Sequence, residues 1–266
     1  MSIKKVLACA LATTAACATF SFAGCGGNDK ETLYVYTNAG FAPYEYVNTR
    51  GEVVGVDIDI MKHIGNELGY NVQVYDIDFN QILNEVQNNK MAVGAAGMTQ
   101  NADRDLVALA SVSYATSVQY VIVPTGTFDA DDLTEGKLPL SKLNDLSNKA
   151  VGIQTGTTGE FMLDDALVED GDLAGFAKRN YDNAIIASRD IGSICGAVII
   201  DKLPAQSISN ANAGLECFEL DAEPESYVLY FNKEATELVS KVNVVLTEMI
   251  ANGTIAQYTL NHSGAN

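Results

Sequence analysis

The chain contains 266 residues, 47% of them hydrophobic, and its 34 acidic residues against 16 basic ones give a formal net charge of −18. This acidity excludes nucleic acid as a partner, because binding to phosphates needs clustered Lys and Arg side chains. No spacing of Cys or His residues predicts a zinc site, and we expect neither a metal nor a cofactor.

The N-terminal segment has the layout of an export signal. Two lysines precede an uncharged, Ala-rich run over residues 6–23, and small residues then precede Cys25. This arrangement resembles a lipobox, so we predict a signal peptide over 1–24, lipidation of Cys25 and a flexible, Gly-rich tether over 25–31. The alternative is a transmembrane helix, although a run of about 18 residues is at the short limit for spanning a bilayer.

Strand and helix patterns alternate in the first half of the remaining chain. The helices are expected to begin near Asp57, Phe79 and Asn101, where apolar residues follow at spacings of three and four. Asp57 is a candidate cap for the first of these helices. The predicted strands cover residues 32–37, 53–56, 71–76, 91–96 and 120–124.

A polar, acidic stretch over 126–139 separates this half from a second unit of the same kind. A helix is expected from about Gly159, and a long amphipathic helix closes the chain. The predicted strands of this unit cover residues 150–153, 197–200, 216–220 and 227–231. The alternation predicts an α/β fold with largely parallel sheets in two units, and the cleft between two such units is a natural ligand site.

Two further features leave alternatives open. Cys195 and Cys217 either form a disulfide, as an exported protein permits, or remain as two thiols near buried strands. The acidic pair Asp57 and Asp59 suggests a metal, but the first turn of a helix explains it, and the acidic run 129–132 lacks the Gly and distal Glu of a calcium loop. We expect both acidic groups to be solvated.

Six blocks, taken together in their order and spacing, resemble family three of the bacterial extracellular solute-binding proteins, which bind polar amino acids for importers. The resemblance extends from Thr32 to about Leu260. The blocks are FAPYEY at 41–46, GEVVGVDIDIMKHIGNEL at 51–68, DFNQIL at 78–83, AGMT at 96–99 followed by Arg104, GIQTGTT at 152–158 and AVIID at 197–201.

The resemblance implies a periplasmic-binding-protein fold of type II, in which two strands join two lobes and the lobes close around a ligand in the cleft. Lobe 1 would comprise residues 32–116 and 225–266, and lobe 2 would comprise residues 119–222. It also implies a monomer, lipid-anchored at the outer face of the cytoplasmic membrane or in the periplasm, that delivers a free amino acid to the permease of an ABC transporter.

The resemblance assigns the two charges of an amino acid to two side chains. Arg104 would pair with the α-carboxylate through its planar fork, and Asp201 would bind the α-ammonium. Removing these charges from water is costly unless each meets an opposite charge. The alternatives are a solvated Arg104 on a short helix and an Asp201 that caps the following helix.

Other residues of the blocks would complete the site. Phe41 and Phe79 would pack on the ligand side chain. Phe41 lies in a loop, where a surface-facing ring is expected, and the alternative for Phe79 is a position in the core. The remaining candidates are small or hydroxyl-bearing residues that allow close backbone approach or donate to the carboxylate: Ala96, Gly97, Thr99, Thr157 and Thr158. A phosphate site is a weak alternative for the Gly/Thr loop, which lacks the Lys-Ser/Thr of a P-loop.

Asn38 and Gln154 are the expected selectors of the ligand side chain. Several members of the family have Asp where this chain has Asn38, and an amide cannot offset a buried cation, so we predict a neutral polar amino acid. No motif of a hydrolase or zinc protease is present, which favours a binding protein over an enzyme. The alternatives are a dehydratase-like enzyme that uses Glu45 or Asp201 on a small cyclic acid, and a ligand-sensing module.

Overall fold

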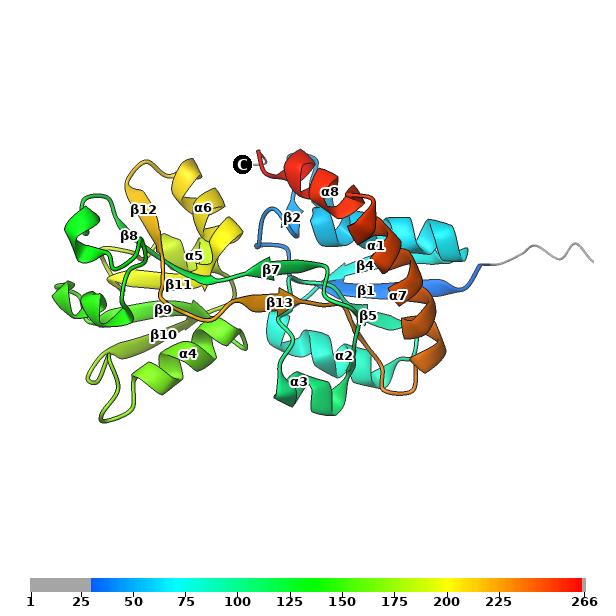
Figure 1. The fold of residues 1–266 in the computed structure, drawn as a ribbon, viewed down its shortest axis with the longest axis horizontal. Coiled ribbons are helices and arrows are strands. Elements are labelled where there is room, and N and C mark those ends of the chain that lie inside the picture. Colours follow the sequence, from blue (N-terminus) through cyan, green and yellow to red (C-terminus); the bar gives the residue numbers. More distant parts are fainter. Residues whose placement is uncertain (1–29, 265–266) are drawn as a thin grey trace, which may run out of the picture.

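The computed structural model describes residues 30–264, which form two α/β lobes joined by a pair of strands (Figure 1). We call the part built on the first sheet lobe 1 and the part built on the second sheet lobe 2. The predicted signal peptide and Cys25 lie outside the described residues. Among the described residues, none of the helices combines the length and apolar character needed to cross a membrane.

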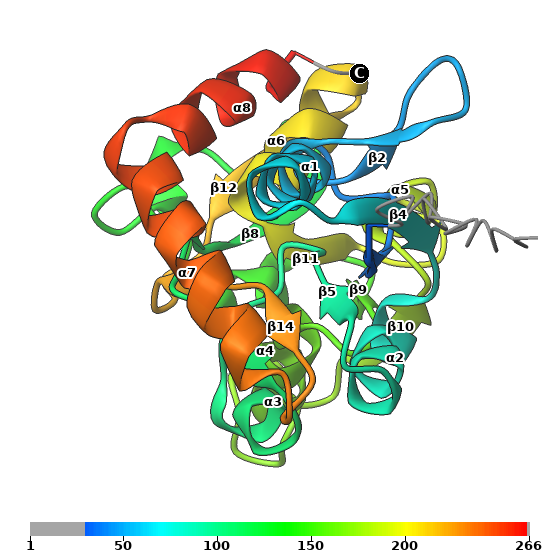
Figure 2. The same ribbon diagram turned by 90° about the vertical axis from the view of Figure 1, so that its right-hand side faces the viewer.

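Lobe 1 contains a five-stranded sheet with the order β4-β1-β5-β14-β6, in which β1 is parallel to both neighbours and β14 is antiparallel. Helices α1, α7 and α8 pack together on one side of the sheet, and α2 and α3 lie on the other (Figure 2). The strands are β1 (Thr32–Thr37), β4 (Asn71–Asp76), β5 (Ala92–Gly94), β6 (Leu109–Ala110) and β14 (Tyr230–Phe231), with a small hairpin of β2 (Tyr46–Val47) and β3 (Val53–Val54). The helices are α1 (Val56–Leu68), α2 (Ile82–Asn88) after a 3-10 turn (Phe79–Gln81), α3 (Ala102–Val107), α7 (Thr236–Ala251) and α8 (Thr254–His262).

Lobe 2 contains a second five-stranded sheet with the order β10-β9-β11-β8-β12, in which β9 is parallel to β10 and β11, whereas β8 is antiparallel to β11 and β12. The strands are β8 (Gln119–Pro124), β9 (Ala150–Gln154), β10 (Ala177–Tyr181), β11 (Ala197–Asp201) and β12 (Leu215–Glu219). The helices are α4 (Thr158–Ala166), α5 (Ala184–Ser188) and α6 (Lys202–Ala211), with 3-10 turns at Ala130–Asp132 and Leu140–Asp145.

Two strands cross between the lobes. β7 (Ala115–Ser117) leads from lobe 1 into β8, and β13 (Glu225–Tyr227) returns from lobe 2. They pair antiparallel, with Glu225 opposite Ser117 and Tyr227 opposite Ala115. We call this pair the hinge. Because side chains alternate along a strand, Glu225 and Tyr227 point to the same face of β13.

The structure corrects several predicted boundaries. The strand expected over 53–56 ends at Val54, because Gly55 has φ of 139° and a Cβ there would lie 2.1 Å from the carbonyl oxygen of Tyr44. Gly55, and not Asp57, is the N-cap of α1. The strand expected over 227–231 is divided between β13 and β14, and the long C-terminal helix is broken before Thr254 by Gly253, whose φ is 79°.

Cys195 and Cys217 are both free thiols, so the disulfide alternative is wrong. Strand β8 lies between β11, which follows Cys195, and β12, which contains Cys217. Two strand spacings are about 10 Å, and Cα atoms more than about 7 Å apart cannot be bridged without backbone movement.

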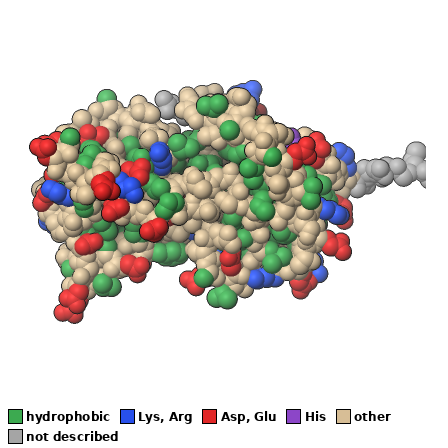
Figure 3. Space-filling view, in the orientation of Figure 1, with side chains coloured by type: hydrophobic (Ala, Val, Ile, Leu, Met, Phe, Trp, Pro, Cys, Tyr) green, Lys and Arg blue, Asp and Glu red, His purple; other side chains and the backbone are tan. Residues whose placement is uncertain are grey.

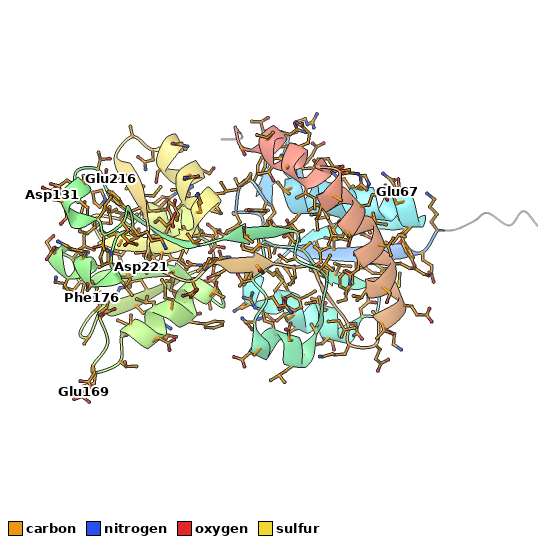
Figure 4. All side chains as sticks on the ribbon, in the orientation of Figure 1. Glu67, Asp131, Glu169, Phe176, Glu216 and Asp221 are labelled. Carbon is orange, nitrogen blue, oxygen red and sulfur yellow. The ribbon has the colours of Figure 1, made fainter. Side chains whose placement is uncertain are left out.

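The surface agrees with the acidic composition. Acidic side chains are spread over the outer parts of both lobes, and few charges lie near the middle of the face in Figure 3. Asp131, at the outer end of lobe 2, points away from the molecule (Figure 4), and Asp129 is also exposed. The expectation of a solvated acidic run at 129–132 is therefore confirmed for these two residues.

Candidate functional site

A small enclosed cavity lies between the lobes beside the hinge, and every residue predicted for the site lines it. The cavity has a volume of about 20 Å³, close to the room that one water molecule needs. The lobes must therefore separate to admit a larger molecule. The predicted residues in its wall are Asn38, Phe41, Phe79, Ala96, Gly97, Thr99, Arg104, Gln154, Thr157, Thr158 and Asp201.

Arg104 is a buried cation whose side-chain hydrogen bonds, among the described residues, go to carbonyl groups. It lies on α3 and is only 6% exposed, so the alternative of a solvated arginine is wrong. Its Nη1 donates to the Thr99 carbonyl (2.7 Å) and its Nη2 to the Gly156 carbonyl of lobe 2 (3.0 Å). Among the described residues it forms no ion pair. Burial lowers the pKa of the guanidinium, and the nearby charges of Glu225 and Asp201 act in the opposite direction. An anion in the cavity would add a direct ion pair.

Asp201 is the complementary group on lobe 2. It ends β11, is 6% exposed, and its carboxylate accepts hydrogen bonds from the Gln119 amide and the Tyr227 hydroxyl. Asp201 occupies the N-cap position of α6, but its side chain makes no capping hydrogen bond, so the alternative that its carboxylate caps the helix is wrong. Burial, together with the nearby charge of Glu225, raises the pKa of Asp201 to about 7. A cation placed beside it would favour the ionised form.

Asp57 supports the loop that follows β5. This loop turns at Gly97, whose φ is 52° and whose amide donates to Asp57 Oδ2 (2.8 Å). The Tyr114 hydroxyl also donates to Asp57 (2.7 Å). Asp57 is 0% exposed and burial raises its pKa to about 6, so the expectation that it is solvated was wrong. Its carboxylate fixes the backbone of the loop instead of facing water.

The N-terminus of α4 reaches the same cavity from lobe 2. Thr157 is the N-cap and its hydroxyl accepts from the amide of Glu160 (3.3 Å). The Thr158 hydroxyl donates to the carboxylate of Glu225 on the hinge (2.8 Å). The first amides of a helix lack partners inside the helix and favour a negative group, so this end of α4 adds to the anion-binding side of the cavity.

The two amide side chains expected to select the ligand meet across the interlobe gap. Gln154 Nε2 donates to Asn38 Oδ1 (2.9 Å), and Asn38 Nδ2 donates to the carbonyl of Ile77 (2.7 Å). Asn38 belongs to lobe 1 and Gln154 ends β9 of lobe 2. The pair therefore satisfies part of its own hydrogen-bonding capacity and helps to hold the lobes together.

Aromatic rings form the apolar part of the wall. The Phe41 ring is 8% exposed and lies 5.9 Å from the ring of Tyr44 and 6.5 Å from that of Tyr227, so it faces the cavity and not bulk solvent. Phe79 packs against a core cluster and also lines the cavity, with the Arg104 guanidinium 5.4 Å from its centroid. Both functions proposed for Phe79, core packing and contact with the site, are thus present at once.

Sequence reasoning missed several groups in the wall or next to it. Gln119 is a polar residue at the start of an apolar strand, a signal that could have found it; Ile199 and Ile200 directly precede Asp201. Glu225 contacts the site from the hinge, where nothing local in the sequence marks it. Glu45 lines the cavity as well, although the sequence suggested it only as a group for an enzymatic alternative.

Glu45 is the most unusual of these groups. It is 1% exposed, and its Oε2 has no hydrogen-bond partner among the described residues. Burial, followed by the charges of Asp57 and Asp201, raises the pKa of Glu45 well above its ordinary value. An unpartnered buried carboxyl oxygen costs free energy, so a donor or cation placed beside Glu45 in the cavity would be favourable.

Comparison with known proteins defines the class of this two-lobed fold. Residues 33–264 match the family of bacterial extracellular solute-binding proteins, family 3, and the chain belongs to this family. It is 26% identical over 253 residues to the arginine-binding extracellular protein ArtP of Bacillus subtilis, covering 91% of this chain and 92% of ArtP. A probable histidine-binding protein of Neisseria gonorrhoeae is 26% identical over 267 residues, covering 95% and 93%. An ancestral arginine-binding protein bound to arginine has a TM-score of 0.75 and 29% identity, covering 87% and 98%.

Proposed function

We propose that this protein is the substrate-binding component of an amino acid ABC importer and closes its lobes around a zwitterion. Arg104 binds the α-carboxylate and Asp201 binds the α-ammonium. The observation that carries the proposal is one buried cation on lobe 1 and one buried carboxylate on lobe 2, both without an ion-pair partner among the described residues and both lining the same cavity. The relatives described as arginine- and histidine-binding support the same class of ligand.

The side chain of the ligand is the second part of the proposal. Asn38 is the basis for predicting a neutral polar amino acid, which is the alternative to the ligand class that we propose here. Glu45 argues for a cationic side chain: a zwitterion uses one charge of Arg104 and one of Asp201, which leaves Glu45 as the unpaired carboxyl group in the wall. A cationic ligand would ionise Glu45 and offset its charge. We therefore propose a cationic amino acid as the preferred ligand.

The surroundings of the protein follow from the same proposal. Members of an extracellular solute-binding family are located outside the cytoplasm, which agrees with the predicted signal peptide. Attachment to the membrane through lipidated Cys25 and recognition by a permease complete the proposal. Replacement of Cys25 by Ala should release the protein from the membrane fraction if the anchor is correct.

A thermal-shift screen with the twenty amino acids and cystine tests this function. A ligand present at about 100 times its dissociation constant stabilises a protein by about 2.7 kcal/mol, and a chain of this size gains roughly 2–4 °C for each kcal/mol. We expect shifts of about 5–10 °C, with arginine and lysine above glutamine. Absence of any shift would contradict the proposed function.

The variant Glu45→Gln is the matched test of ligand class in the same screen. It keeps the shape of the side chain and removes its capacity to become charged. We expect arginine and lysine to lose at least about tenfold in affinity, because their cation would be buried without a counter-charge, while glutamine loses much less. A wild-type preference for glutamine would contradict the cationic class but leave the site for the zwitterion intact.

A dehydratase-like enzyme on this fold is the competing function. Glu45, whose pKa lies well above its ordinary value, and Asp201, whose pKa is about 7, could act as an acid and a base in one cavity. Turnover of small cyclic acids by the purified protein, lost in Glu45→Gln, would establish the enzyme. Binding of amino acids without turnover would support the importer component.

A further inference from the structure

Glu225 of the hinge strand β13 forms hydrogen bonds to both lobes, and the inference drawn from them rests on the proposed function. Its Oε2 accepts a hydrogen bond from Thr99 Oγ1 of lobe 1 (2.5 Å) and another from Thr158 Oγ1 of lobe 2 (2.8 Å). Its Oε1 accepts a hydrogen bond from Gln119 Nε2 of lobe 2 (3.0 Å). One carboxylate therefore joins both lobes and the hinge.

The two hydroxyl groups involved are the same ones that the proposed site offers to the α-carboxylate of the ligand. A threonine hydroxyl carries a single hydrogen and can donate it to one acceptor at a time. While Thr99 and Thr158 donate to Glu225, neither can donate to a ligand. A second carboxylate placed on these donors would also meet the like charge of Glu225.

We propose that Glu225 is an internal substitute for the ligand carboxylate, which holds the lobes together and must be displaced before an amino acid can bind. The three hydrogen bonds stabilise a closed arrangement that competes with the ligand-bound one. A competing closed state lowers the apparent affinity in proportion to its population. Glu225 thus sets both the resting conformation of the protein and its affinity.

The position of Glu225 suits this function. It lies two residues from Tyr227 on the same face of β13, and Tyr227 donates to Asp201. Gln119 donates to both Asp201 and Glu225 through one amide nitrogen. If a ligand displaces Glu225, Gln119 loses one acceptor and donates to Asp201. Binding of the ligand carboxylate and binding of the ligand ammonium are therefore coupled through the Gln119 amide.

The variant Glu225→Gln tests the proposal in two measurements. In small-angle X-ray scattering without added amino acid, it should have a larger radius of gyration than the wild type, because the charge-assisted hydrogen bonds across the lobes are weakened. In calorimetry with L-arginine and L-glutamine, it should bind the preferred amino acid about tenfold more tightly, because the loss of one charged hydrogen bond from the competing state is worth at least that factor.

Glu223→Gln is the matched control. Glu223 precedes the hinge, is exposed, and makes no side-chain hydrogen bond or ion pair among the described residues, so the same change of charge should leave both measurements as in the wild type. Unchanged or weaker ligand binding by Glu225→Gln would overturn the competition, and an unchanged radius of gyration would overturn the closure. If neither protein binds an amino acid, the proposed function fails, while the scattering result still decides whether Glu225 holds the lobes together.

Discussion

Replacing Arg104 by Ala should abolish amino acid binding, with a loss of about a thousandfold in affinity. Truncating one partner of a buried charge pair costs on the order of 4 kcal/mol, because the ligand carboxylate would be buried without its bidentate donor. The melting temperature without ligand should change little. Removal of the side chain loses its packing on Phe79, which lowers stability. It also removes the cost of burying a cation whose hydrogen-bond partners are two carbonyl groups, so the two effects offset each other. Calorimetry and thermal unfolding measure the two effects.

Two further variants make this result specific. Arg104→Lys keeps the positive charge but lacks the planar fork, so it should bind more weakly than the wild type and more tightly than Arg104→Ala. Arg179 is exposed on β10, and Arg179→Ala should bind as the wild type does. If Arg104→Ala fails to fold while Arg104→Lys folds and binds normally, the arginine is structural and its proposed function is wrong.

Asp201→Asn should also abolish binding, yet it should make the protein without ligand more stable at neutral and alkaline pH. Burial raises the pKa of Asp201 from 3.8 to about 7. A change of one in pKa corresponds to about 1.4 kcal/mol, so keeping the ionised group buried costs on the order of 4 kcal/mol. After the loss of a hydrogen bond worth about 1–2 kcal/mol, we expect Asp201→Asn to gain about 2 kcal/mol in its free energy of unfolding.

The pH dependence distinguishes this cause from others. Between pH 4 and pH 7 the folded protein holds the Asp201 proton and the unfolded chain does not, so the stability of the wild type declines as pH rises through this range. Above pH 7 the decline from this group is complete. The difference in unfolding free energy between Asp201→Asn and the wild type should therefore increase from pH 4 to pH 7 and remain constant above pH 7.

Denaturant unfolding over this pH range measures the difference, and Asp131→Asn serves as the control because Asp131 is exposed at the outer end of lobe 2. Asp57 is present in both proteins and its pKa shift has no contribution from Asp201, so it cancels in the difference. The charge of Asp201 raises the pKa of Glu45, so its removal also relieves Glu45 and adds to the difference in the same direction. A variant that is less stable than the wild type at pH 8 would show that the ionised Asp201 is satisfied by Gln119 and Tyr227 alone, and that it needs no cation from a ligand.

The two α/β units could be predicted from local signals, whereas the charged poles of the site were predicted from the resemblance to a known family. Strand and helix periodicities predicted the two α/β units. The blocks that carry the resemblance assigned Arg104 and Asp201 to the two charges of an amino acid, and both residues line one cavity. The structure confirms the two-lobed fold and brings these residues together, although the lobe boundaries and the binding functions stay proposals. The expectation of largely parallel sheets was wrong, because each five-stranded sheet has two parallel and two antiparallel pairs of neighbouring strands.

The missed features depend on contacts between distant segments. Asp57 has the sequence context of an ordinary first helical turn, and only the amide of Gly97 and the hydroxyl of Tyr114 make it a buried support. Glu225 lies in a short hinge strand with no pattern of its own, and its partners come from both lobes. Glu45 belongs to the block at residues 41–46, which was identified in the sequence. A periodic pattern does not show which side chains of a loop face a cavity, so the burial of Glu45 could not be predicted.

Calorimetric titration with an amino acid and two derivatives, each lacking one of the two backbone charges, measures what each end of the zwitterion contributes to binding. L-arginine and L-glutamine would each be compared with the methyl ester, which lacks the carboxylate charge, and with the Nα-acetyl form, which lacks the ammonium charge. The preferred free amino acid should bind, and both of its derivatives should lose at least about a hundredfold in affinity, since each leaves Arg104 or Asp201 buried without its partner. An ester or acetyl derivative that binds as tightly as the free amino acid would contradict the proposed binding of the two charges by Arg104 and Asp201.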